Sequence, residues 1–233
     1  MDKTAIEKIE AMAKPNTIGI GGRMYTDKRI FAVEEPEVES VVLSTLSGLV
    51  DIVKQERQKF PEKLVVHVVS PYKVNVYSSI RNGDRSRETP YVCKWDRVDV
   101  DFECKLDYET MMIMLKSRFV QTPEMLELVK LLGNITEQNS AQVSDDGFSQ
   151  KVVVRKGIAL KDNKTINPII KLRPYRTFLE VEQPESEFLL RLSDGARVAL
   201  YEADGGAWKL EARKNIANYL RESLKDSGAI VVE

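Results

Sequence analysis

The stretch that decides the fold runs from Ile169 to Leu220. It opens with IIKLRPYRTFLEVEQP at residues 169–184 and, after a hairpin, continues with EADGGAWKLEA at residues 202–212. Strand-forming runs, turn sequences and a helix start therefore follow one another in one short region. No cluster of catalytic residues stands out there, so the stretch predicts architecture rather than chemistry. Its aromatic packing residues are Phe178, Phe188, Tyr201 and Trp208.

The second half of this stretch predicts a hairpin followed by a helix. Apolar runs at residues 188–192 and 197–201 flank the turn sequence SDGA. Asp204 is placed to cap the closing helix, and the glycine pair after it permits a tight turn. We expect Trp208 to pack on the sheet where this helix begins. The residues to which we assign an architectural role are Pro174, Phe178, Gln183, Pro184, Asp204, Gly205, Gly206 and Trp208.

Upstream, hydrophobic periodicity predicts further strands and a central pair of helices. Asp107 is a good N-cap for a helix through Phe119, and Thr122 and Pro123 open a second helix that Gly133 would end. The expected strands lie at residues 63–69, 73–80, 91–95, 97–106, 151–160, 169–173, 178–182, 188–192 and 197–201.

The N-terminal part predicts two helices. A short amphipathic helix over residues 2–13 carries Ile6 and Ile9 on one face, and we expect it to dock on the body or on a neighbouring copy. A long helix is expected from Pro36 to about residue 59, with an apolar stripe that includes Val41 and Val42.

The order of these elements favours an α+β fold. We expect a largely antiparallel sheet with a long N-terminal helix, a central helix pair and a C-terminal helix. One domain is expected over residues 1–233, with a possible subdivision into 1–135 and 150–233.

Composition limits the class of protein. Thirty-five basic residues against 36 acidic residues give a formal net charge of −1, which is not the bulk charge of a dedicated nucleic-acid binder. No apolar run is long enough to span a membrane, and the N-terminus does not resemble a signal peptide. Cys93 and Cys104 are then expected as free thiols, and the protein as cytoplasmic and without a cofactor.

Alternating charges in the expected strand at residues 97–106 raise the possibility of a metal site. Asp99, Asp101, Glu103 and Lys105 would share one face of the strand, where carboxylates hold Mg²⁺ and the lysine stabilises an attacked phosphate. A solvated polar face is the simpler interpretation. A Mg²⁺-dependent nuclease is the less favoured hypothesis.

A basic and aromatic neighbourhood could contact nucleic acid. Arg173, Tyr175 and Arg176 are suited to phosphate binding and base stacking, and Arg81 and Arg85 lie in a charged loop. Acidic residues follow closely at positions 180, 182, 185 and 187, so ion pairs within or between subunits are the favoured interpretation of the first group.

Other motifs predict no catalysis. GIGGR at residues 19–23 lacks the glycine spacing of a dinucleotide-binding fingerprint and predicts a turn. His67 is the only histidine and lies in an apolar strand, which favours a core or cross-strand position. We therefore assign no catalytic residue.

The motif LRPYRTF at residues 172–178, the EQP of residues 182–184 and EADGGAW at residues 202–208 resemble an uncharacterised family encoded by bacteriophages and prophages. The shorter pieces HVVSP at residues 67–71 and LKSRF at residues 115–119 fit the same resemblance. It implies a phage origin and a bacterial host cell, but no catalytic residues, substrate or cofactor.

The resulting expectation is a non-enzymatic phage-derived protein that acts by self-association or by binding a phage or host partner. The alternative is an accessory protein of phage DNA metabolism that binds nucleic acid.

Overall fold

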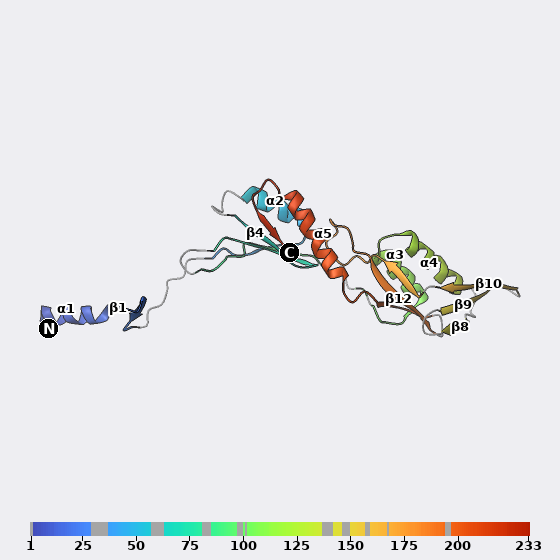
Figure 1. Cartoon of the computed structure of the whole chain (residues 1–233), viewed down its shortest axis with the longest axis horizontal. Coiled ribbons are helices and arrows are strands. Elements are labelled where there is room, and N and C mark those ends of the chain that lie inside the picture. The colour runs from blue at the N-terminus through green and yellow to red at the C-terminus, as the bar shows by residue number, and fades with distance from the viewer. Residues whose placement is uncertain are drawn as a thin grey trace. The chain divides into compact units, whose positions relative to one another are not determined.

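A computed structural model describes residues 2–28, 37–56, 63–80, 85–96, 100, 102–136, 142–145, 150–156, 159–166, 168–193 and 197–233. The chain divides into two units, Met1–Glu37 and Val38–Glu233 (Figure 1). The expected single domain over residues 1–233 and its possible subdivision into 1–135 and 150–233 stay predictions.

The described residues 2–28 of the first unit form one helix and one hairpin. Helix α1 spans Lys3–Ala13, and the antiparallel strands β1 (Thr17–Ile20) and β2 (Arg23–Thr26) follow it. Gly21 and Gly22 join the strands with φ of 59° and 77°. Positive φ at both central residues is typical of a two-residue type I′ turn, which explains the glycine pair. The turn expected in this glycine-rich stretch is thereby confirmed.

The second unit contains a five-stranded sheet of order β14-β4-β5-β6-β3. Its outer strands, β14 and β3, pair in parallel with β4 and β6, and the inner pairings are antiparallel. The bounds are β3 Val41–Leu43, α2 Leu46–Glu56, β4 Val65–Ser70, β5 Lys73–Tyr77, β6 Tyr91–Lys94, α5 Trp208–Ser223 and β14 Ile230–Val232.

Helices α2 and α5 pack together on one face of this sheet (Figure 1). The alternation of apolar residues along β4 and β5 puts Val66, Val68, Val74 and Val76 into the resulting core, all fully buried. From α5, Ile216 and Leu220 enter the same core, as the four-residue spacing predicts.

A second core forms on an antiparallel sheet of order β11-β12-β13-β7. Three phenylalanines pack at its centre, with ring centroids of Phe102 and Phe188 5.1 Å apart and Phe119 near both. The bounds are β7 Leu106–Asp107, α3 Tyr108–Arg118, α4 Pro123–Thr136, β11 Ile169–Leu172, β12 Ser186–Ser193 and β13 Arg197–Glu202.

A third antiparallel sheet has the order β10-β9-β8. Its strands are β8 Gln142–Asp145, β9 Gln150–Lys156 and β10 Ala159–Ile166. The single strand expected over residues 151–160 is therefore wrong: this range belongs to two strands, β9 and β10, which pair antiparallel with each other.

The α+β class with largely antiparallel pairing is confirmed. The central helix pair is also present as α3 and α4, and Asp107 accepts a hydrogen bond from the Thr110 amide as the predicted N-cap does. Gly133 does not end α4, which continues to Thr136.

The long N-terminal helix is wrong. Helix α1 has 11 residues, and the helix expected from Pro36 begins only at Leu46 as the 11-residue α2. Val41 and Val42 form β3 instead, because they pair with Tyr91 and Val92 of β6. β-Branched residues fit either pattern, and a partner strand far along the chain decides between them. Pro36 itself lies outside the described residues.

The strand expected at residues 97–106 is also wrong where the structure describes it. Only Leu106 and Asp107 pair, as β7. Phe102 packs into the second core instead of continuing the strand, and Glu103 has φ of 66°, a left-handed conformation that no strand contains.

Candidate functional site

The segment Arg173–Gln183 joins the two cores of the second unit. Leu172 before it and Phe188 after it are buried in the core on β12, whereas Phe178 and Val181 are buried in the core under α2 and α5. The strand expected at residues 178–182 is wrong, because this segment is a bent connection. The bend places the Arg176 side chain inside the protein, whereas Tyr175, Leu179 and Glu180 line a pocket.

The Gln183 side chain stabilises the bend by forming hydrogen bonds with backbone groups that have no partner in a strand. Its Oε1 accepts hydrogen bonds from the amides of Arg176 and Thr177 at 3.0 and 3.3 Å. Its Nε2 donates to the carbonyls of Phe178 and Val181 at 3.0 and 3.3 Å. The side chain is buried, so these bonds replace the missing strand pairing.

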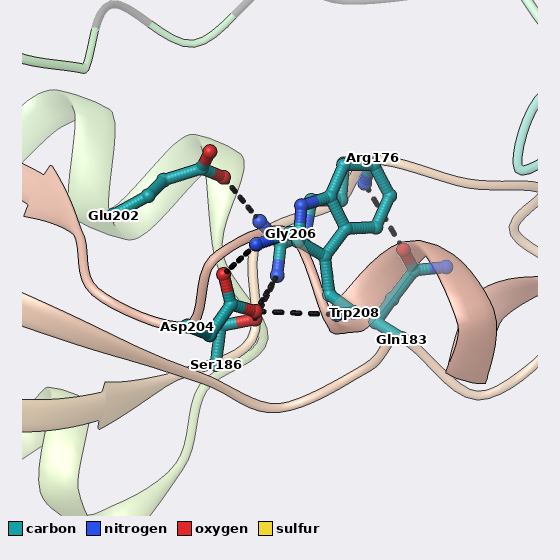
Figure 2. A network of polar contacts seen from close by, with 7 residues as sticks. All are labelled: Arg176, Gln183, Ser186, Glu202, Asp204, Gly206 and Trp208. Atoms are coloured by element: carbon teal, nitrogen blue, oxygen red, sulfur yellow. Dashed lines mark hydrogen bonds and ion pairs between the residues drawn. The ribbon is translucent and has the colours of Figure 1, made fainter.

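Arg176 lies at the centre of a buried polar network (Figure 2). Its side chain is 8% exposed, and Nη1 donates to Oε1 of Glu202 at 2.6 Å. Nη2 donates to Ser186 Oγ and lies 4.0 Å from Asp204 Oδ2. The guanidinium carbon lies 3.9 Å from the ring centroid of Trp208, a cation–π contact. Burial lowers the pKa of Arg176 to about 10 while the two carboxylates act to raise it, so the group is charged at neutral pH.

Asp204 connects this network to the start of α5. Its Oδ1 accepts the Gly206 amide at 3.0 Å, and its Oδ2 accepts the Trp208 amide at 3.2 Å and Ser186 Oγ at 2.8 Å. Burial acts to raise the pKa of Asp204, but these hydrogen bonds and the charge of Arg176 outweigh it and hold the pKa below its usual value. Gly205 and Gly206 have φ of 61° and 82°, which a glycine pair adopts without strain.

The basic residues around this network are paired within the fold. Arg173 Nη1 lies 2.7 Å from Glu182 and its Nε lies 3.6 Å from Glu185, which Lys171 also approaches at 3.6 Å. Phosphate binding was the less favoured interpretation of Arg176, and its guanidinium is buried and paired with Glu202. Arg173 is one-third exposed and keeps its carboxylate partners.

A pocket of about 850 Å³ lies on the other side of the connecting segment. Its lining comes from the start of α2, the end of β6, the end of α3 and the connecting segment. The lining residues are Ser44, Thr45, Trp95, Asp96, Ser117, Arg118, Tyr175, Leu179 and Glu180.

Two polar groups of the lining are already engaged by α2. Glu180 Oε1 accepts the amides of Leu46 and Ser47 at 2.8 and 3.4 Å, so a carboxylate occupies the N-terminus of this helix. Thr45 Oγ1 accepts the Gly48 amide at 3.2 Å. Beneath them, burial and the charge of Glu180 raise the pKa of the Cys93 thiol to about 12, so Cys93 is not a nucleophile.

The remaining polar groups of the lining have no partner among the residues that the structure describes. These are the Arg118 guanidinium, the Asp96 carboxylate, the Tyr175 hydroxyl, the Trp95 indole N–H and the hydroxyls of Ser44 and Ser117. Trp95, Arg118 and Tyr175 are half-buried, whereas Asp96 and Leu179 are exposed. The pocket therefore offers aromatic faces, one cation and one anion to a ligand.

The predicted metal residues do not form a described cluster. Asp99 and Asp101 lie outside the described residues, and Glu103 is exposed with its amide donating to the Leu200 carbonyl at 2.8 Å. No group of three or more metal-ligating side chains occurs in the described part of the chain. His67 lies half-buried on β4, with its ring centroid 6.2 Å from that of Tyr77 on β5.

Of the two loop arginines, Arg81 lies outside the described residues, and Arg85 is exposed with φ of 60°. Arg85 is not among the lining residues of the pocket. Of those predicted nucleic-acid contacts that the structure describes, Tyr175 alone is a lining residue.

Comparison of this chain with family models, with curated proteins and with solved structures finds no match. Within the described residues, no helix has both the length and the apolar character to cross a bilayer.

Trp95 and Arg118 were not predicted from the sequence as site residues, and Asp96 was considered only as an upstream acid of the metal site. No local motif identifies the three as a group, since they belong to the ends of β6 and α3 and meet Tyr175 only after folding.

Proposed function

We propose that this chain is a non-enzymatic protein that acts by self-association, and that residues 2–28 are its assembly element. The observation that carries the proposal is the exposure of every apolar side chain in that segment. Its apolar side chains are between 44% and 71% exposed: Ile6, Ile9, Met12, Ile18, Ile20, Met24 and Tyr25. Phage origin, a bacterial cytoplasm and a phage or host partner belong to the same proposal and rest on the motif resemblance.

The segment closes on itself through polar contacts only. Asn16 donates its amide and its Nδ2 to Asp27, both at 2.8 Å, which closes the open end of the hairpin. Lys28 Nζ donates to the Lys14 carbonyl at 2.7 Å and to Met12, at the C-terminal end of α1. No side chain of α1 or β1 is buried by these contacts.

A helix and a hairpin of this size need a covering surface. Isolated helices shorter than about 12–15 residues and isolated two-stranded hairpins are marginal in water. Helix α1 has 11 residues and no buried side chain. Association that covers the Ile6 and Ile9 stripe supplies the missing apolar burial.

A second copy of α1 is a suitable cover. Lys3 and Glu10 are seven residues apart and therefore lie on the same edge of the apolar stripe. In an antiparallel pair of α1 helices like edges meet, so Lys3 of each copy approaches Glu10 of the other. The charges of the helix thus favour a symmetric pair, and the apolar face of the hairpin extends the contact beyond the helices.

The test is the native mass of the full chain by size-exclusion chromatography with light scattering. We expect an oligomer for the wild type and at least tenfold weaker association for Ile9→Glu, which places a charge in the stripe. Ala11→Glu is the matched control, because Ala11 lies on the opposite side of α1. A monomeric wild type, or equal losses in both variants, contradicts the proposal.

The pairing itself has a separate test. Lys3→Glu brings like charges together and should weaken association, whereas Lys3→Glu with Glu10→Lys restores opposite charges and should recover it. Failure of the double variant to recover the mass excludes the antiparallel α1 pair but not assembly through the segment.

A further inference from the structure

We infer that the pocket lined by Trp95, Arg118 and Tyr175 binds a nucleotide unit, with the base against the aromatic side chains and the phosphate on Arg118. This inference goes beyond assembly and does not depend on it, since no residue of 2–28 lines the pocket.

The aromatic side chains provide a surface for a planar ring. Trp95 follows β6, and Tyr175 lies on the connecting segment, where its amide donates to the Arg118 carbonyl at 2.8 Å. Both side chains are half-buried, so the fold holds them while part of each stays accessible. Leu179 adds an apolar side chain that is 66% exposed. Stacking of a base on an aromatic side chain contributes about 1–3 kcal/mol.

Arg118 provides the anion contact. It is half-buried and has no ion-pair partner among the described residues, in contrast to Arg173 and Arg176. Of the two carboxylates in the lining, Glu180 is engaged by the amides of α2. The planar guanidinium offers a fork of donors that fits two phosphate oxygens.

Asp96 and two hydroxyls complete the recognition. The Asp96 carboxylate accepts hydrogen bonds only, which suits an amino or imino N–H on the edge of a base. Ser44 and Ser117 supply exposed hydroxyls to the same lining. A purely apolar ligand would bury Arg118 without a partner, and a simple anion would leave the aromatic faces unused. A volume of about 850 Å³ lies within the range of ligand pockets.

One nucleotide fits this pocket better than a polyphosphate. The lining contains one guanidinium and two carboxylates, so additional phosphates would meet repulsion. The unit can come from a free mononucleotide or from one unpaired position of a single strand, and the experiment separates these sources.

Tryptophan fluorescence reports binding directly, because the chain has two tryptophans and Trp208 is buried under Arg176. The full chain is titrated with the four nucleoside 5′-monophosphates, their nucleosides, inorganic phosphate and a short single-stranded oligonucleotide. We expect saturable quenching by at least one monophosphate and about tenfold weaker binding of its nucleoside.

Variants assign the contacts. Arg118→Gln should weaken monophosphate binding about tenfold and leave nucleoside binding unchanged, whereas Tyr175→Leu should weaken both. Arg221→Gln is the control with the same change in charge, since Arg221 is exposed on α5 outside the pocket lining. Circular dichroism checks that each variant is folded.

Monophosphate binding at least tenfold tighter than binding of the oligonucleotide per site indicates a free nucleotide as the source, and tighter binding of the oligonucleotide, or binding of it alone, indicates a single strand. The inference is overturned if no nucleotide or oligonucleotide quenches saturably up to millimolar concentration. It is also overturned if phosphate competes as well as the nucleotide, or if Arg118→Gln and Arg221→Gln lose binding equally.

Discussion

Arg176 lies within the connecting segment Arg173–Gln183, and Arg118 lies next to that segment, where its carbonyl accepts the Tyr175 amide. The two arginines differ in what surrounds their charge. Arg176 is 8% exposed and paired with Glu202, and it stacks on Trp208. Arg118 is half-buried in a pocket lining and has no ion-pair partner among the residues described. One guanidinium therefore stabilises the fold, whereas the other is available to a ligand. Residue type does not distinguish these roles; the surroundings do.

The largest expected effect comes from removing the buried arginine. Arg176→Ala leaves Glu202 and Asp204 without their cation and opens space beside Trp208, so the free energy of unfolding should fall by about 3–5 kcal/mol. Arg118→Ala should change it by no more than about 0.5 kcal/mol. Urea denaturation of both variants measures the contrast, and similar losses would show that Arg118 also has a structural role.

A smaller loss of stability is expected when Asp204 of the buried network is replaced, and this loss should depend on pH. The pKa of Asp204 is lowered in the folded protein, so its contribution is complete above the unfolded pKa of about 4 and is lost as pH falls through the folded pKa. At pH 6, Asp204→Asn should lower the free energy of unfolding by about 1.5–3 kcal/mol, the usual contribution of hydrogen bonds to a charged group.

At a second pH, below the unfolded pKa of about 4 and approaching the lowered folded pKa, the wild-type carboxyl takes up a proton, so the difference between wild type and Asp204→Asn should shrink. The charged groups that face this carboxyl are Arg176 and, through it, Glu202. Urea denaturation at both pH values measures the change. A difference that is independent of pH contradicts the assignment of the shift to the folded carboxylate.

The smallest effect concerns the pocket lining itself. Glu180→Ala removes the acceptor of the Leu46 and Ser47 amides, so the free energy of unfolding should fall by about 1 kcal/mol. The neighbouring side chain of Leu179 is 66% exposed, so Leu179→Ala should have almost no effect on the free energy of unfolding. Thermal unfolding followed by circular dichroism compares the two. A large loss for Leu179→Ala would show that the pocket is part of the core.

Local patterns predicted the elements whose stabilising contacts are local. The Asp107 cap with α3, the hairpin of β12 and β13, and the stripe from Trp208 to Leu220 all follow from spacing and capping chemistry. The long helix failed at Val41 and Val42 because β-branched residues also suit a strand, and pairing with β6 decides.

The site was less predictable than the fold. Tyr175 was expected to contact a ligand, and it does line the pocket, but Trp95, Asp96 and Arg118 come from the ends of β6 and α3. The burial and pairing of Arg176 depend on Glu202 and Asp204, which follow it by more than twenty residues. Burial and partner are properties of the folded chain, so no local window contains them.

The sequence by itself determined the class of fold, the Asp107 cap, the glycine turns and the apolar stripe of α1, because these depend on backbone conformation and on side-chain periodicity. The tertiary structure alone decided which arginine is buried, which aromatic residues meet in a pocket and which valines form a strand. These outcomes depend on contacts between distant segments, and their free energy arises only when the cores on either side of Arg173–Gln183 are packed.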